Sequence, residues 1–472
     1  MLCGVLALLI LFNVIFHAFA TRFRWYLYTS EQYTHEIGTA SETLFSGNEE
    51  EVRVIFCMPE EELLGDSIYS LVLNTFRQLE ARHDFLSVEF VNIYLHPSAV
   101  KPYRGEDPET GKERYPITEQ SVIFVRGQGA SEVFRVESLS SFFVLDEEKT
   151  ITAYNGEEIG LSCIRWVLRD RHPVAAFTST HGENFGELLA FATTLTASGY
   201  DLSVLDLHGE IPEEVELIVI ANPRWDFDRS APGPGIRSEL DRLAEFLARG
   251  GSLFVSLDPY AKADLEGLRG FLAERGLTAG TAVIRDRENS ITYDGYTLIT
   301  DVADGPRAAA LSDRLGAYTS SHSVVREASA ITCRTVGGWQ AEPLLLSSPS
   351  SECYEGGALV DREGSYPVFA VSSAEVEGGK AATVLLSSGV YLLADDVLNS
   401  ATYENRATVL AALELASGEE NPVGCRILAV ETGRLEDLTM GTARLYAVLL
   451  SVVLPLAVLS VGGICVIRRK TR

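Results

Sequence analysis

The stretch VAAFTSTHGENFGELLAFATTL (174–195) has the pattern of a buried strand that runs directly into an amphipathic helix. Residues 174–179 form a short apolar run, which is typical of a strand covered on both faces. Apolar residues then recur at helical spacing, at Phe185, Leu188, Leu189, Ala192 and Leu195. The polar residues 180–184 therefore mark a strand-to-helix connection.

The same alternation continues along the chain. Further apolar runs predict strands at 202–207, 217–221 and 252–257. Between the last two, an apolar stripe at helical spacing stops at Gly250-Gly251, which is typical of a helix C-terminus. Strands that alternate with helices indicate a parallel, doubly wound sheet.

The fold class is therefore α/β, and we predict two α/β domains. The first covers 49–171, with a helix around 68–79 and strands at 52–57, 88–93, 121–125 and 133–136. The second covers 172–425 and has a β-rich extension beyond about residue 280. This extension has short strands at 291–298, 344–347, 368–371 and 382–386, and a last helix follows at 404–415.

Charge and hydropathy are unevenly distributed. The 39 Lys+Arg and 66 Asp+Glu of the 472 residues give a net charge of −27, which excludes a nucleic-acid coat or a polybasic membrane binder. Two uncharged apolar runs stand at 2–20 and 445–467. At about 1.5 Å per helical residue, each comes near the ~30 Å hydrocarbon thickness of a bilayer. We therefore predict two transmembrane helices that contact membrane lipid, with the acidic part between them.

The flanks of these runs predict the topology. Arg468, Arg469 and Lys470 belong to a basic tail, 468–472, and such clusters stay on the cytoplasmic side. Both termini are then cytoplasmic, and residues 21–444 lie outside the plasma membrane. The first run is either an uncleaved signal anchor or a cleaved signal peptide ending at Ala18-Phe19-Ala20. Asn13 and Pro455, inside the runs, are expected to pack against neighbouring helices.

Five cysteines lie outside the apolar runs, and an odd number cannot pair completely. We expect buried free thiols, with a Cys333–Cys353 bridge as the alternative. No Cys/His spacing suggests a zinc site.

The candidate site is the carboxyl edge of the second sheet, where ligands bind in open α/β sheets. The polar residues that follow its strands are His181, Glu183, Asn222, Asp226 and Asp258. A histidine beside carboxylates suits a metal ligand or a general base. Helix capping is the primary expectation for 181–184, because Glu and Asn satisfy the free N–H groups of a helix start. The second His-Gly-Glu, at His208, shows how readily this tripeptide recurs.

Nucleotide and nucleophile motifs are missing. Gly378-Gly379-Lys380 lacks the upstream glycine and the following Ser/Thr of a P-loop, and neither GxSxG nor HExxH occurs. We therefore expect no cofactor and no metal, and any ATP-driven process would require another chain to hydrolyse the ATP.

Several short motifs follow one another along nearly the whole chain. They are Phe12-Asn13-Val14, residues 26–43, Ala153-Tyr154-Asn155-Gly156-Glu157, Thr180-His181-Gly182-Glu183, residues 217–223, FLARGGSLFVSLDP (246–259), and a C-terminal segment with Pro455, Gly462 and Gly463. In this order and spacing they resemble the GldG-like auxiliary components of ABC-type transport systems, a family named after a gliding-motility protein. The chain departs from the family in lacking a basic leader and in its Pro/Gly-rich insert at 230–235.

The resemblance implies a two-span subunit with two extracytoplasmic α/β domains, which works beside a separate ABC ATPase and a multi-span permease and has no established catalytic residues. We therefore predict a non-enzymatic accessory subunit whose outer domains bind substrate or partner proteins. The alternative is an anchored extracytoplasmic hydrolase that uses His181, Glu183 and Asp258. A third possibility is a surface scaffold that uses its acidic face for adhesion.

Overall fold

The structure is a computed structural model that describes residues 35–105, 113–129, 132–146, 148–228, 237–261, 264–316, 322–376, 378–379 and 381–430. The two apolar runs, with Asn13 and Pro455, lie outside the described residues, as does the basic cluster 468–470. Within the described part of the chain, no helix has the length and apolar character that a membrane crossing requires.

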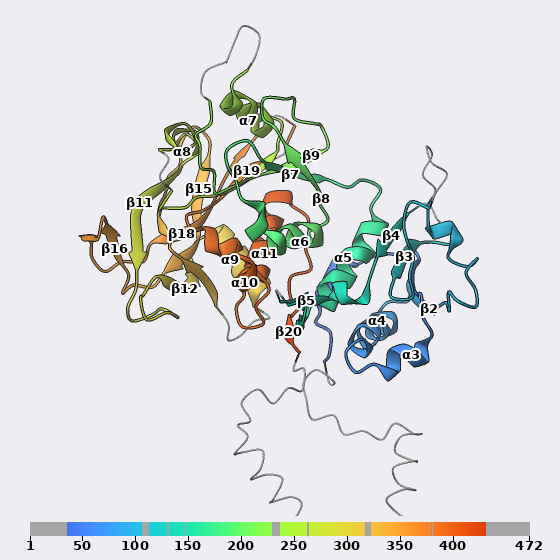
Figure 1. Cartoon of the computed structure of the whole chain (residues 1–472). Helices are drawn as coiled ribbons and strands as arrows, with labels where there is room; N and C mark the ends of the chain where they lie inside the picture. The colour runs from blue at the N-terminus through green and yellow to red at the C-terminus, as the bar shows by residue number, and fades with distance from the viewer. Residues whose placement is uncertain are drawn as a thin grey trace, which may run out of the picture. The chain divides into compact units, whose positions relative to one another are not determined.

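A nine-stranded mixed sheet forms the core of the region from residue 172 on (Figure 1), with the order β13-β12-β15-β18-β19-β10-β9-β7-β8. Five neighbouring strands are parallel: β8 (Asp201–Leu205), β7 (Val174–Thr178), β9 (Val215–Ala221), β10 (Ser252–Ser256) and β19 (Ala381–Ser387). Four antiparallel strands extend the sheet: β18 (Pro367–Glu375), β15 (Gln340–Ser347), β12 (Thr297–Val302) and β13 (Ser323–Arg326). The predicted parallel sheet is confirmed.

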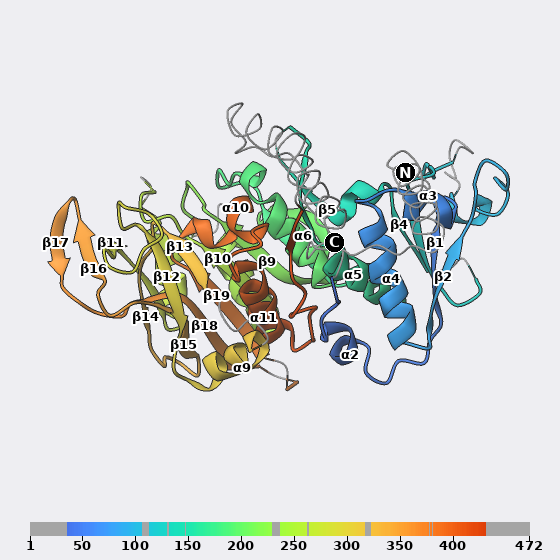
Figure 2. The ribbon, with the colours of Figure 1, turned by 90° about the horizontal axis from the view of Figure 1, so that it is seen from below.

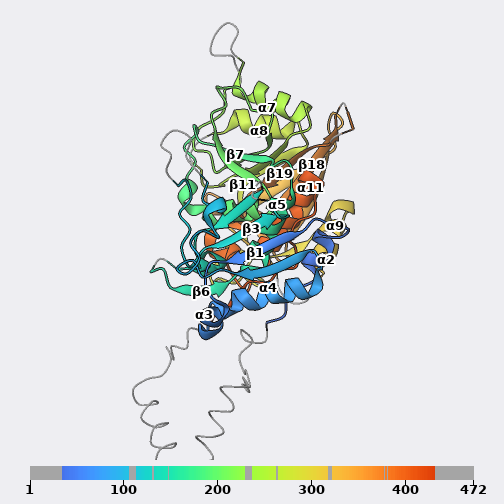
Figure 3. The same cartoon turned by 90° about the vertical axis from the view of Figure 1, so that its right-hand side faces the viewer.

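Helices cover both faces of the parallel strands, which is why those strands are continuously apolar. On β9, Val219 belongs to the core shared with α6 (Leu189–Ala197) and α11 (Asn405–Ser417). The preceding residue, Ile218, belongs to the opposite core, with α7 (Glu239–Ala248) and α8 (Glu266–Ala273). Figures 1 and 3 show α7 and α8 on one side of the sheet and α11 on the other. The sheet is therefore doubly wound.

Helix boundaries follow local capping groups. Ser238 accepts a hydrogen bond from the N–H of Asp241 (3.1 Å) and starts α7, and Gly250, with φ of 88°, follows its end. The predicted helix over 185–195 is divided into a 3-10 turn, η4 (Phe185–Glu187), and α6. Helices α8, α9 (Pro306–Leu315) and α10 (Asp395–Leu398) were not predicted.

The extension beyond residue 280 is β-rich, as predicted. A second sheet has the order β14-β11-β16-β17, formed by β14 (Ser329–Cys333), β11 (Leu277–Arg285), β16 (Glu352–Glu355) and β17 (Ala358–Asp361). The predicted strand at 291–298 is wrong over most of its length. Asp294 accepts hydrogen bonds from the Thr292 hydroxyl (2.6 Å) and the Tyr296 N–H (3.1 Å). Gly295 has φ of 83°, so the chain turns there and β12 begins only at Thr297.

None of the five cysteines among the described residues forms a disulfide, and four of them are buried. Cys333 lies on β14 and Cys353 on β16, on opposite sides of β11. The alternative of a Cys333–Cys353 bridge is therefore wrong.

The region before residue 172 contains a smaller sheet, β2-β1-β3-β4. Its strands are β2 (Leu86–Phe90), β1 (Val52–Phe56), β3 (Val122–Arg126) and β4 (Val133–Val136). Two helices, α4 (Ser70–Arg82) and α5 (Gly156–Leu168), pack side by side against it (Figure 2), while α2 (Ala40–Leu44) and α3 (Glu60–Gly65) are shorter. Phe76 of α4 is fully buried and contacts the rings of Phe56, Phe124 and Phe142.

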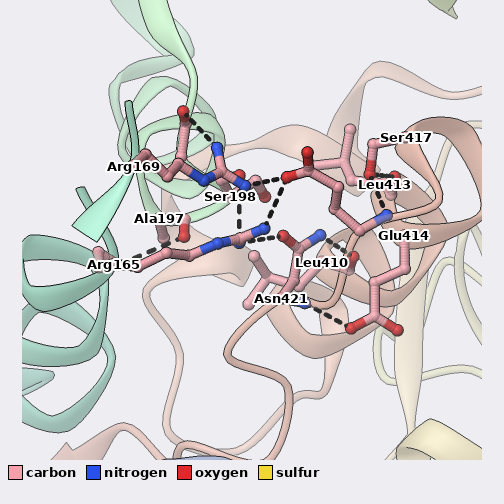
Figure 4. Close-up of polar contacts among 12 residues, drawn as sticks. Arg165, Arg169, Ala197, Ser198, Leu410, Leu413, Glu414, Ser417 and Asn421 are labelled. Carbon is pink, nitrogen blue, oxygen red and sulfur yellow. Dashed lines mark hydrogen bonds and ion pairs between the residues drawn. The ribbon is translucent and has the colours of Figure 1, made fainter. Parts of the chain in front are cut away.

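Helix α5 is bound to the C-terminal part of the chain by buried charged groups. Arg406 of α11 donates to both carboxylate oxygens of Glu158, and both side chains are buried. Arg165 donates to Asn421 Oδ1 (2.9 Å), as Figure 4 shows, and also to Glu419 (3.0 Å). Burial lowers the pKa of Arg165 to about 10, so the guanidinium stays protonated at neutral pH.

The two ends of the described chain meet at the start of α5. The N–H of Gly38 donates to Glu157 Oε1 (2.9 Å), and a Cβ on Gly38 would lie 2.9 Å from the carbonyl oxygen of Gly424. A three-stranded sheet completes this junction, in which β6 (Ile151–Tyr154) pairs with β5 (Phe143–Leu145) and β20 (Leu428–Ala429) (Figure 1). The chain therefore enters and leaves this part of the structure at one place.

Candidate functional site

The order of the parallel strands creates a switch point. Along the chain β7 is the first strand and β8 the second, yet β9, the third, lies on the other side of β7. The helix after β7 covers one face of the sheet and the helix after β9 covers the opposite face. The connections after β7 and β9 therefore run from neighbouring carboxyl ends toward opposite faces of the sheet. In open α/β sheets, ligands bind at such a switch point, outside the carboxyl ends of the strands.

Strand register brings two histidines to this edge. Thr178 pairs with Leu205 between β7 and β8. His181 and His208 follow these two residues at the same offset along their chains. Glu239, the first residue of α7, lies between them: its Oε2 is 3.0 Å from His181 Nε2, and its Oε1 is 3.5 Å from His208 Nδ1.

Glu239 is a buried carboxylate, with 3% of its surface exposed. Burial alone raises the pKa of such a group, but hydrogen bonds from His181 and from the N–H of Asp228 (2.9 Å) outweigh burial and lower the pKa of Glu239. The position at the N-terminus of α7 also favours negative charge. Glu239 is therefore ionised at neutral pH.

Each histidine has a further partner that fixes its ring. His181 is buried and stacks on Phe227, with ring centroids 3.7 Å apart. His208 is half exposed, and its Nδ1 lies 2.9 Å from Asp206 Oδ1, which also accepts the His208 N–H. These hydrogen bonds lower the pKa of Asp206 and raise the pKa of His208.

One ligand-type atom from each of His208, Asp228 and Glu239 lies within 4.8 Å of the others. We refer to these three residues, with Asp206 and His181, as the switch-point cluster. A nitrogen and carboxylate oxygens that converge at this spacing could hold a metal ion.

The predicted residues Glu183 and Asn184 shape the loop after β7. The Glu183 carboxylate accepts hydrogen bonds from the Thr178 hydroxyl (2.6 Å) and the His181 N–H (2.8 Å), so it closes the loop. Asn184 accepts the N–H of Gly186 and caps η4, as expected for this segment. Of the five predicted site residues, only His181 and Glu183 are joined by described contacts.

The other three predicted residues stabilise turns and a helix end. Asn222 has φ of 51° and its N–H donates to Ser256 O. Asp226 accepts the N–H groups of Gly267 (2.6 Å) and Leu268 (3.0 Å) at the start of α8. Asp258 accepts the N–H of Tyr260 (2.8 Å). Within the described residues, no hydrogen bond or ion pair connects Asp258 to His181 or Glu183.

The sequence did not identify His208, Asp228 and Glu239 as neighbours. His208 belongs to a repeated His-Gly-Glu tripeptide, and Glu239 has the ordinary appearance of an acidic residue in a first helical turn. One available signal was the matching position of the two His-Gly-Glu tripeptides after adjacent strands. The contact of Glu239 with the two histidines depends on where α7 begins, and the spacing of apolar residues alone does not predict that position.

Comparison with known proteins gives no family. No family model and no curated protein matches the chain. Among solved structures, the N-terminal domain of mmIFT52 is 15% identical and covers 52% of this chain and 97% of that chain, with a TM-score of 0.39. A putative ThuA-like protein from Bacteroides uniformis is 14% identical, with coverages of 54% and 97% and a TM-score of 0.31. Likenesses this distant carry no argument about function.

Proposed function

We propose that this protein is a non-enzymatic, membrane-anchored accessory subunit of an ABC transport complex. Its two α/β domains would lie outside the plasma membrane, both termini would be cytoplasmic, and its two spans would dock on the permease. The observation that carries the proposal is the pair of uncharged apolar runs, 2–20 and 445–467, on either side of an acidic α/β segment without a nucleotide motif. The resemblance of the motif order to GldG-like components is the reason for proposing an ABC transport complex.

The junction at the start of α5 supports this topology. A domain placed between two spans of one membrane needs both its ends on the same side. Here the N–H of Gly38 binds Glu157, and Gly38 approaches the carbonyl oxygen of Gly424. Short segments then connect this junction to each apolar run.

The cluster at the sheet switch point supports a binding role for the outer part of the chain. It combines a buried carboxylate, two histidines and exposed acidic groups at the edge where open α/β sheets hold ligands. The alternative hydrolase that uses His181, Glu183 and Asp258 is less well supported, because Asp258 is engaged in a turn with Tyr260.

Affinity purification in a mild detergent tests the proposal. A tagged full-length chain, produced in its own cells, should recover a P-loop ATPase and a multi-span permease in constant ratio. The control variant replaces residues 445–467 with a polyleucine span of the same length, which keeps the anchor and removes the docking face. We expect this variant to lose both partners. Repeated recovery of the wild-type chain alone would refute the proposal.

A further inference from the structure

We propose that His208, Asp228 and Glu239 form a binding site for a divalent metal ion, with zinc as the ion that the donor set fits. Their ligand-type atoms lie within 4.8 Å of one another at the switch point of the parallel sheet. The inference does not depend on the proposed transport role, because it concerns only groups of this chain.

The strongest evidence is a buried carboxylate oxygen that accepts no hydrogen bond from the described residues. Glu239 Oε2 is paired with His181 Nε2 (3.0 Å) and the Asp228 N–H (2.9 Å). Oε1 of the same carboxylate is buried and has no hydrogen-bond partner among the described residues, and its ion-pair contact with His208 Nδ1 is long, at 3.5 Å. Leaving a buried charged acceptor without a hydrogen bond costs more than leaving a neutral one. A bound cation would supply the missing interaction.

Neighbouring residues also hold His208 and Glu239 in place through hydrogen bonds, as is common for metal ligands. A metal-binding histidine usually has its ring oriented by a carboxylate, and a metal-binding carboxylate is itself hydrogen-bonded. Asp206 holds the His208 backbone through its N–H and contacts ring Nδ1 (2.9 Å), the nitrogen that also faces Glu239 Oε1, which leaves Nε2 without a described contact to Asp206 or Glu239. His181, stacked on Phe227, holds Glu239. His181 and Asp206 are thus positioning residues.

The donor types favour zinc over calcium or magnesium. One imidazole nitrogen and two carboxylates make three protein ligands, which is the number that a zinc site with one open position has. Calcium and magnesium prefer shells made of six or more oxygen atoms. His208 and Asp228 are exposed, so the ion has a path from solvent.

Zinc titration of the full-length, chelator-treated protein in detergent tests the site, with a chromophoric chelator as competitor. We expect one Zn²⁺ per chain and at least a tenfold weaker affinity in His208→Ala, Asp228→Asn and Glu239→Gln. Glu210→Gln is the matched control, because it removes an exposed carboxylate close to His208 in sequence, and it should bind as the wild type does.

Three results would overturn the inference: no stoichiometric zinc binding, equal affinity in wild type and His208→Ala, or Ca²⁺ binding as tight as Zn²⁺ binding. His208 is half exposed, so the His208→Ala variant carries the test if Glu239→Gln fails to fold. The transport proposal is judged separately. The His208→Ala variant should still recover the ATPase and the permease. If the transport proposal fails, zinc binding by the wild type should be unchanged.

Discussion

At the scale of single residues, Glu157 is a carboxyl group placed where ionisation is unfavourable. Only 2% of its surface is exposed, and burial raises its pKa to about 7, against an ordinary value of 4.5. Hydrogen bonds from the Gly38 N–H and the Cys425 thiol oppose this shift but do not cancel it. The group that holds the two chain ends together therefore titrates close to neutral pH.

This pKa gives the first prediction. A carboxyl group with a raised folded-state pKa contributes stability that is complete below about pH 4.5 and is lost as the pH rises through about 7. The variant Glu157→Gln keeps an acceptor for Gly38 but cannot ionise. We expect its free energy of unfolding to exceed that of the wild type by about 1–3 kcal/mol near pH 8 and to match it near pH 4.

Urea unfolding of the full chain in detergent, at several pH values, measures this difference. The control is Glu61→Gln, at an exposed position on α3, for which the difference from wild type should be small at every pH. A Glu157→Gln difference that stays constant across the pH range would contradict the assigned cause.

At the scale of elements, the packing of α4 against α5 requires a glycine. A Cβ on Gly160 of α5 would lie 2.9 Å from Cζ of Phe76, whose ring is fully buried among other aromatic rings. Gly→Ala in an exposed helix usually stabilises by about 1 kcal/mol. Here we expect Gly160→Ala to destabilise by about 1–3 kcal/mol, because the ring has no free space.

Thermal or urea unfolding compares this variant with Gly65→Ala at the end of α3, where an added Cβ meets no atom within 4 Å. The control should leave stability unchanged or raise it slightly. A Gly160→Ala variant that is as stable as the control would show that α4 and α5 separate more easily than their contact suggests.

The sequence predicted some elements well for a physical reason. β7, β9 and β10 are covered on both faces, so each is a continuous apolar run that is visible without knowledge of its neighbours. Helix α5 had no such pattern. Its buried residues include Glu158 and Arg165, which pair with Arg406 and Asn421, 248 and 256 positions away. Polar residues whose partners are so distant look like surface residues in a sequence.

The candidate site was predictable only in part, for a similar reason. The carboxyl edge of the sheet and His181 follow from the strand pattern. The contact between His181 and Glu239, 58 positions apart, depends on where α7 starts relative to β7. Asp226 and Asp258 are residue types that are common in binding sites, but their carboxylates accept hydrogen bonds from backbone N–H groups.

At the scale of the whole described chain, the meeting of its two ends gives a further prediction. A larger side chain at Gly38 would press on the carbonyl oxygen of Gly424 and disturb the hydrogen bond to Glu157. We expect Gly38→Val to speed amide hydrogen exchange several-fold in 36–40 and 424–429. Strands β10 and β19, in the same sample, should exchange as in the wild type. Unchanged exchange at both ends would contradict this view of the junction.

The junction also has a mechanical consequence. A force that pulls residue 37 away from residue 429 would act on the Gly38–Glu157 hydrogen bond and on the two-residue strand β20. The nine-stranded sheet lies outside that line of load, since neither end of the described chain belongs to it. Tension would therefore peel the ends apart before it stretched the sheet. Strain applied to the two ends would therefore be released at the junction, while the residues at the switch point of the sheet keep their arrangement.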